Sequence, residues 1–263
     1  IGNDHRVVLY GDAQPMVVTR AWWVLSALGH ERVSILDGGL AGWTRQGRPL
    51  TDAVVVREPA VFVPRINAAM VADAERVARA VDGGSGERLV NALSPEQHAG
   101  TGGAHYGRPG RIPGSVNVPA RELVDPATMT WLPADAIAQR FAAAGVGDAD
   151  APVITYCGGG IAASVAFFAL KLIGRERVAL YDNSLLEWSA DPARPGIMSD
   201  YPPEPCHGPS HPPGRLSRLR ACRAARPRGD VARAGRAPRP DRPQRHRQVL
   251  AAEDPGRAGA PGR

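Results

Sequence analysis

Residues 153–188 read VITYCGGGIAASVAFFALKLIGRERVALYDNSLLEW, and this stretch decides the fold. A short apolar run at 153–156 predicts a strand, and the longer apolar run at 162–173, closed by Gly174, predicts a helix. A second short apolar run follows at 178–181. Two strands joined by a crossover helix form a parallel pair, so the stretch predicts an α/β fold.

The same order of elements occurs near the N-terminus. The sequence predicts a short buried strand at 7–10, a helix at 18–28 that stops at Gly29, and a strand at 33–36. A shift of 145 positions aligns residues 22–43 with 167–188 without a gap. The identical pairs are Leu25/Leu170, Gly29/Gly174, Glu31/Glu176, Arg32/Arg177, Val33/Val178, Asp37/Asp182, Leu40/Leu185 and Trp43/Trp188. The chain therefore contains a duplicated strand–helix–strand unit, and we expect a parallel sheet with helices on both faces.

The two copies differ in what precedes them. The second follows a predicted helix at 68–81, strands at 89–92 and 116–118, and a helix at 134–144. The first has no such elements before Ile1, and we expect it to be the back half of a unit whose front half is missing. The predicted division is an incomplete first unit at 1–50, a proline-rich linker at 51–66, a catalytic unit at 67–200 and a disordered Arg/Pro-rich tail at 201–263.

The charge is unevenly distributed along the chain. Residues 1–205 carry 18 basic and 22 acidic residues, whereas residues 206–263 carry 14 arginines and 4 acidic residues. The pI of about 9.8 is thus a property of the tail, and we expect no nucleic-acid binding by the folded part. The tail is interpreted either as a basic arm that contacts nucleic acid or anionic lipid, or as an unstructured segment read out of frame.

The remaining composition limits location and assembly. No apolar run reaches the ~20 residues of a membrane helix, and the first residues do not resemble a signal peptide. The three cysteines, Cys157, Cys206 and Cys222, are too few for a disulfide framework. We expect a cytoplasmic monomer that does not contact a membrane.

Cys157 is the candidate nucleophile. It follows a predicted strand and precedes a helix, which places it at the carboxyl edge of the sheet, where α/β sites gather. Gly158, Gly159 and Gly160 allow successive backbone N–H groups to converge, and the helix adds its positive end. Such a loop stabilises a thiolate and then a persulfide. A cysteine in this place can also be an ordinary small buried residue.

Four motifs together resemble the rhodanese family of sulfurtransferases in order and spacing. They are SPEQ at 94–97, GRIPGSVNVP at 110–119, the loop YCGGGIAAS at 156–164, and YDNSLLEW at 181–188, whose counterpart in the first copy is LDGGLAGW at 36–43. The resemblance covers residues 1–200. It implies a tandem fold in which the first unit is inactive, and Gly11 stands where Cys157 stands in the second.

The resemblance also implies the reaction. A sulfane sulfur would move from thiosulfate or 3-mercaptopyruvate through a Cys157 persulfide to cyanide or a thiol, without a metal or an organic cofactor. The expected substrate-binding residues are Gly158, Gly159, Gly160, Ile161, Ala162, Ala163, Arg108 and Arg111. The loop is closer to the mercaptopyruvate-type pattern CGSGVT than to the thiosulfate-type CRKGVT. Gly159 and Ala162 replace the Ser and Thr of that pattern, so the donor stays open.

Two other functions compete with this prediction. A phosphatase or arsenate reductase with a related cysteine loop needs an arginine six residues after the nucleophile to bind an oxyanion. Ala163 occupies that position, which argues against this class. A non-catalytic binding or scaffold fragment is the remaining alternative, because the first unit is incomplete.

Overall fold

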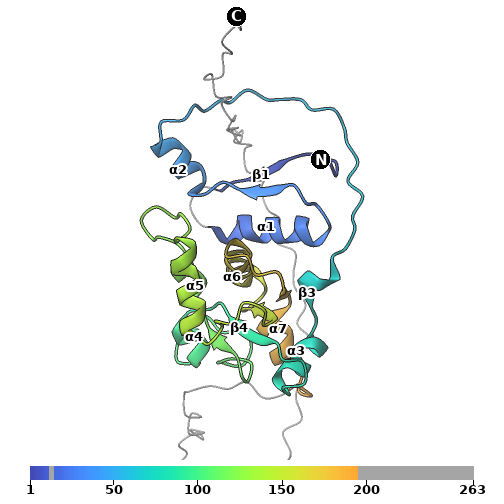
Figure 1. The fold of residues 1–263 in the computed structure, drawn as a ribbon, viewed down its shortest axis with the longest axis vertical. Coiled ribbons are helices and arrows are strands. Elements are labelled where there is room, and N and C mark those ends of the chain that lie inside the picture. The colour runs from blue at the N-terminus through green and yellow to red at the C-terminus, as the bar shows by residue number, and fades with distance from the viewer. Residues whose placement is uncertain (12–14, 195–263) are drawn as a thin grey trace, which may run out of the picture.

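The computed structural model describes residues 1–11 and 15–194. The chain begins with a two-stranded parallel sheet, β1 (Val7–Leu9) and β2 (Val33–Ile35), connected by helix α1 (Pro15–Ala27) and followed by α2 (Gly39–Arg45). Gly29 has φ 86°, a left-handed conformation that ends the α1 segment where the sequence predicts a stop. α1 lies between this small sheet and the rest of the protein (Figure 1).

The second part contains a five-stranded parallel sheet in the order β3-β7-β6-β4-β5. Its strands are β3 (Val71–Ala72), β4 (Arg88–Asn91), β5 (Val116–Asn117), β6 (Val153–Tyr156) and β7 (Val178–Tyr181). β6 and β7 are buried at every position, as expected for parallel strands covered on both faces. The parallel α/β fold predicted from the sequence is confirmed.

Helices surround this sheet. They are η1 (Ala68–Met70), α3 (Ala74–Val81), α4 (Pro95–Ala99), η2 (Ala120–Leu123), α5 (Ala134–Ala143), α6 (Ile161–Leu172) and α7 (Ser184–Ala190). α6 contacts β6 and β7 on one side and α1 on the other, so residues 163–170 are all buried. The chain thus places α6, which directly follows Cys157, at the centre of the protein (Figure 1).

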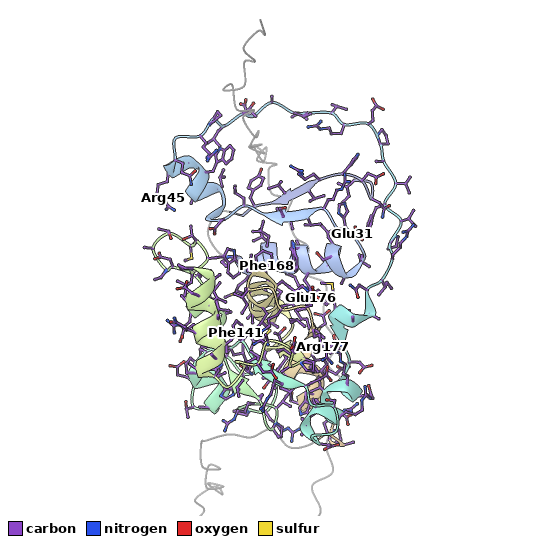
Figure 2. All side chains as sticks on the ribbon, viewed as in Figure 1. Glu31, Arg45, Phe141, Phe168, Glu176 and Arg177 are labelled. Atoms are coloured by element: carbon purple, nitrogen blue, oxygen red, sulfur yellow. The ribbon has the colours of Figure 1, made fainter. Side chains whose placement is uncertain are left out.

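The duplicated helices α1 and α6 contact each other at equivalent positions. Thr19 Oγ1 and Ser164 Oγ lie 2.8 Å apart, and the two residues are 145 positions apart in the sequence. Trp22 and Phe167, separated by the same shift, have ring centroids 6.2 Å apart. The Phe168 ring packs edge-on against the Trp22 ring, with centroids 4.8 Å apart, and lies between the two copies (Figure 2). Residues that the shift of 145 positions relates therefore contact each other between α1 and α6.

Three expectations need correction. The predicted strand at 7–10 forms but is not buried: Val8 is 52% exposed, because only β2 pairs with it. The predicted helix at 68–81 is divided into η1, β3 and α3, because the Asp73 side chain accepts the N–H of Arg76 and starts the helix there. The predicted helix at 18–28 begins three residues earlier, at Pro15, a favourable first helical residue.

Residues 51–66, the segment predicted as a linker, lie between α2 and η1. Residues 52–66 contain no helix or strand and pass around the outside of the small sheet (Figure 1). Arg65 N–H donates to Leu28 O and Asn67 N–H donates to Ala27 O, so the linker returns along the end of α1. The tail predicted at 201–263, and the last six residues of the unit at 67–200, lie outside the described residues. The domain division stays a prediction.

None of the helices in the described part combines the length and the apolar character that a bilayer crossing requires.

Candidate active site

Cys157 lies directly after β6 and before the loop that starts α6. The carboxyl ends of β4 and β6 are neighbours, since Asn91 pairs with Tyr156. Cys157 is therefore at the carboxyl edge of the sheet, the position predicted from the sequence. Its side chain is a free thiol and only 3% exposed.

The loop carbonyls are turned toward α7. Leu185 N–H donates to Cys157 O at 3.2 Å, and Leu186 N–H donates to Gly158 O at 3.0 Å. In a trans peptide the carbonyl and the following N–H point in opposite directions, and the described residues contain no cis peptide. The N–H groups of Gly158 and Gly159 therefore point away from α7. This arrangement is one that can surround an anion.

The first turn of α6 extends this row of N–H groups. Gly160, with φ 81°, ends the loop in the left-handed conformation, and Ile161 is the first helical residue. The first N–H groups of a helix have no partner within it, and the helix dipole is positive there. Ile161 is half-exposed and Ala162 partly buried, while Ala163 is fully buried. Ala163 can thus serve a ligand only through its backbone. That these residues bind substrate stays a prediction.

Ser184 is a site residue that the sequence argument did not single out. Its Oγ accepts the N–H of Cys157 at 3.0 Å and donates to Tyr181 O at 2.7 Å. Its φ is 51°, an unfavourable conformation for a residue with a side chain. The backbone of Cys157 is therefore fixed by a buried hydroxyl held in a strained position. The only signal in the sequence is its place in the YDNSLLEW motif.

Tyr106 is a second residue that was missed. A Cβ added to Gly158 would overlap its ring atoms Cδ2, Cε2 and Cζ, so the ring lies directly against the loop. Ser189 Oγ donates to Tyr106 O at 2.8 Å and ties this segment to α7. The glycine at 158 is thus required by close packing against the Tyr106 ring. Tyr106 also packs against the buried core cluster that includes Cys157.

Tyr156 anchors the GRIPGS segment beneath the loop. Its hydroxyl accepts Ile112 N–H at 3.0 Å and lies 2.6 Å from Ser115 Oγ, which donates to Ile112 O. Burial is the largest influence on this phenol and raises its pKa, against the opposing effect of the bond to Ser115. Tyr156 therefore stays protonated and has a structural role beside Cys157.

The two predicted arginines occupy other surroundings. Arg108 is exposed in the segment after Tyr106. Arg111 donates to His98 O at 3.3 Å, near the negative end of α4. Two clefts lie near the loop, one lined by Ala162 and Tyr106 among others and the other by Gly159 among others. Neither Arg108 nor Arg111 lines either cleft. Arg121, which the sequence analysis did not consider, does line one of them. A substrate role for Arg108 and Arg111 stays a prediction.

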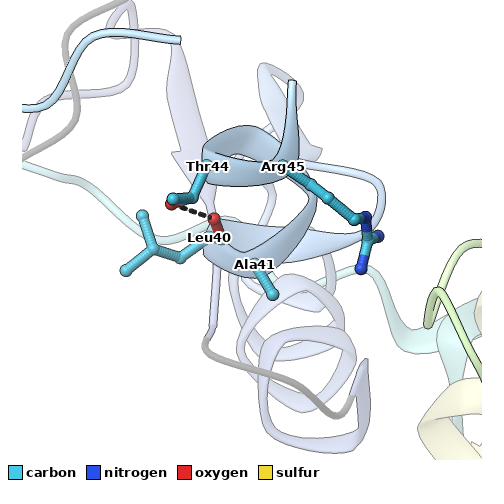
Figure 3. Close-up of a pocket in the computed structure, with 4 residues that line it drawn as sticks. All are labelled: Leu40, Ala41, Thr44 and Arg45. Atoms are coloured by element: carbon cyan, nitrogen blue, oxygen red, sulfur yellow. Dashed lines mark hydrogen bonds between the residues drawn. The ribbon is translucent and has the colours of Figure 1, made fainter. Parts of the chain in front are cut away.

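The two clefts near the loop have no lining residue in common. One, of about 540 Å³, is lined by Met16, Gln97, Tyr106, Arg121 and Ala162, among others. The other, of about 510 Å³, is lined by Arg20, Gly159, Asp182, Asn183, Leu186 and Glu187. A third hollow of about 480 Å³ lies over α2, lined by Leu40, Ala41, Thr44 and Arg45 (Figure 3), and shares no residue with the loop.

Within residues 1–11 and 15–194, no group of three His, Cys, Asp or Glu side chains is arranged to hold a metal ion.

Comparison with known proteins defines the class. The family model of the rhodanese-like domain matches residues 1–46 and 74–191. The chain is 34% identical to a 3-mercaptopyruvate sulfurtransferase of Escherichia coli over 214 residues, which cover 78% of this chain and 70% of that protein. The chain belongs to the rhodanese-like family. Other curated relatives are named 3-mercaptopyruvate or thiosulfate sulfurtransferase, and together they support a sulfurtransferase enzyme.

Solved structures agree with the fold. The crystal structure of SseA from Escherichia coli superimposes with a TM-score of 0.61 at 31% identity, covering 70% of this chain and 68% of that one. A structure of an EanB variant in complex with ergothioneine gives a TM-score of 0.67 at 24% identity, covering 77% of this chain. The chain spans about half the length of EanB, at 53%, and this likeness concerns the fold alone.

Proposed function

We propose that the protein transfers sulfane sulfur through a persulfide on Cys157. The observation that carries the proposal is the position of this thiol. It stands at the carboxyl edge of the sheet, where the loop carbonyls turn toward α7 and the N–H groups of Gly158 and Gly159 turn away from it. Converging N–H groups at a helix start stabilise a negatively charged sulfur in both the thiolate and the persulfide state.

The reaction proceeds in two displacements. The Cys157 thiolate attacks the outer sulfur of thiosulfate, forms an S–S bond, and releases sulfite with the electron pair of the broken bond. With 3-mercaptopyruvate, the thiolate attacks the donor sulfur, the C–S bond breaks as the S–S bond forms, and the proton of the donor's thiol ends on the carbon of the departing pyruvate. An acceptor nucleophile then attacks the outer sulfur of the persulfide. Cyanide leaves as thiocyanate and a thiol leaves as a persulfide, and the Cys157 thiolate is restored.

The donor enters most directly through the cleft that contains Ala162 and Tyr106. Arg121 lines this cleft together with the acid Glu122, whose carboxylate is paired with Arg140. A guanidinium there attracts the sulfonate-like end of thiosulfate or the carboxylate of 3-mercaptopyruvate. Arg108 and Arg111 act, in this proposal, only as more distant charges. The free thiol suits the reducing cytoplasm, where we propose that the enzyme works as a monomer.

The test is mass spectrometry after exposure to each donor. The purified chain is expected to gain the mass of one sulfur atom, localised to the peptide that contains Cys157. Cys157→Ser should abolish this gain, while a variant in which Cys206 and Cys222 are both replaced by serine should retain it. Labelling that persists in Cys157→Ser would overturn the assignment. No gain from either donor would favour the non-catalytic binding fragment, which the deep burial of the thiol also suits.

A further inference from the structure

An ion pair joins the two copies beside the cysteine loop. Arg20, on α1 of the first copy, donates from Nη2 to Oδ2 of Asp182 at 2.8 Å, and its Nη1 contacts the other oxygen of the same carboxylate. The guanidinium also lies over the ring of Trp23, 4.7 Å from its centroid. Two contacts to Asp182 along the edge of the guanidinium, and the Trp23 ring against its face, fix the orientation of Arg20.

This pair lies directly against the loop. A Cβ added to Gly160 would overlap Oδ1 and the carbonyl oxygen of Asp182, and would be 3.1 Å from Arg20 Nη1. Arg20 and Asp182 also line the cleft that includes Gly159. The carboxylate therefore touches the residue that ends the loop and starts α6. Left alone, this negative charge would oppose a second negative charge on the cysteine sulfur.

The pair is absent at the equivalent place in the first copy. The shift of 145 positions that relates Thr19 to Ser164 relates Arg20 to Val165, which is fully buried. The acid equivalent to Asp182 is Asp37, whose Oδ1 accepts the N–H of Trp131 at 2.9 Å. Thr19 and Ser164, at the centre of the α1–α6 contact, are related by the shift, but Arg20 has no charged counterpart. The arginine therefore stands only beside the loop that contains Cys157.

We infer that Arg20 is a positioning residue for the Cys157 loop and acts through Asp182. It neutralises the carboxylate that touches Gly160 and holds it in place, so that the loop can carry the charge of the thiolate and of the persulfide. The site of the second copy is in this sense completed by a side chain of the first. This inference rests on the proposed sulfur transfer.

The experiment compares two ways of breaking the same ion pair. Arg20→Gln leaves the carboxylate unpaired, and we expect sulfur gain from a saturating donor to be severalfold slower, because the Asp182 side chain is 38% exposed and water screens part of its charge. Asp182→Asn removes the negative charge instead, and we expect sulfur gain at least as fast as in the parent chain. Arg20→Gln combined with Asp182→Asn should recover most of the parent rate.

Arg45→Gln is the matched control. Arg45, the last residue of α2, also reaches from the first copy to the second, where it donates to Thr128 O at 3.2 Å. It lines the hollow over α2, which shares no residue with the Cys157 loop. Its loss should leave the rate of sulfur gain unchanged.

The outcomes separate this inference from the proposed function. If the parent chain gains no sulfur, the proposed function fails. If the parent is active and Arg20→Gln is as fast, Arg20 has no role. Equal losses in Arg20→Gln and Asp182→Asn would mean that the pair is only a structural tie, and would overturn the inference. Should Arg20→Gln fail to fold, as judged by circular dichroism, Asp182→Asn still decides, because a severalfold loss there contradicts the electrostatic role.

Discussion

The two copies of the strand–helix–strand unit share one backbone design and differ in the chemistry placed on it. In the first copy Leu40 N–H donates to Gly11 O at 2.9 Å, and in the second the equivalent Leu185 N–H donates to Cys157 O. The paired strands also have equivalent registers, Val7 with Val33 and Val153 with Val178. Gly11 therefore stands where Cys157 stands, as predicted by aligning Tyr10 with Tyr156, a shift of 146 that differs by one position from the shift relating the helices. The framework does not by itself make a site.

A second difference concerns the residue whose side chain contacts the backbone N–H of Cys157. Gly39 and Ser184 are equivalent, and both adopt a left-handed conformation, with φ of 56° and 51°. Glycine adopts this conformation without strain, whereas serine does so at a cost of roughly 1–2 kcal/mol. Only the copy with the cysteine bears that cost, and there the serine hydroxyl accepts the cysteine N–H. The comparison indicates that the strain is retained for the hydroxyl.

The largest effect is expected from Gly158→Ala. The new methyl group would overlap the ring of Tyr106, and overpacking of this kind costs about 1–3 kcal/mol of the free energy of unfolding. We also expect sulfur gain to be lost, because the loop must shift. Thermal unfolding and donor kinetics measure the two effects. Adding Tyr106→Ala should restore stability by removing the ring, and a double variant as unstable as Gly158→Ala alone would contradict the contact.

A smaller effect is expected from Ser184→Ala. It leaves the N–H of Cys157 without its acceptor, at a cost of about 1–3 kcal/mol, and should slow sulfur gain about tenfold. Ser184→Gly separates strain from chemistry. It should unfold at a higher denaturant concentration than Ser184→Ala, because glycine suits a positive φ, yet transfer sulfur no faster. Full activity in either variant would show that the hydroxyl is dispensable.

The double variant Gly11→Cys and Cys157→Ser is expected to gain no sulfur when it is treated with a donor. The new thiol would lie above Gly39, which has no hydroxyl, and beside a helix with Val165 in the place of Arg20. Mass spectrometry of the donor-treated protein checks this directly. Sulfur found on residue 11 would show that the shared backbone is sufficient, and would remove the reason for treating Ser184 and Arg20 as site residues.

Much of the fold could be predicted because its signals are local. The apolar runs gave β6, α6 and β7 to within one residue, and Gly29 and Gly174 marked the ends of two helices. The first part of the expected helix at 68–81 could not be separated from α3, since a two-residue strand such as β3 has no periodicity of its own. Its identity depends on pairing with β7, far along the chain.

The site divides in the same way. The sequence by itself determined the position of Cys157 between a strand and a helix, the glycine loop beside it and the internal similarity, because each is written in neighbouring residues or in a constant shift, while the role of Cys157 as nucleophile stays a prediction. Only the tertiary structure decided that Tyr106 covers Gly158, that Ser184 holds the N–H of Cys157, and that Arg20 reaches Asp182. These contacts join residues 27 to 162 positions apart, and their partners are chosen by the packing of α1 against α6 and of α7 against the loop, which no local pattern encodes.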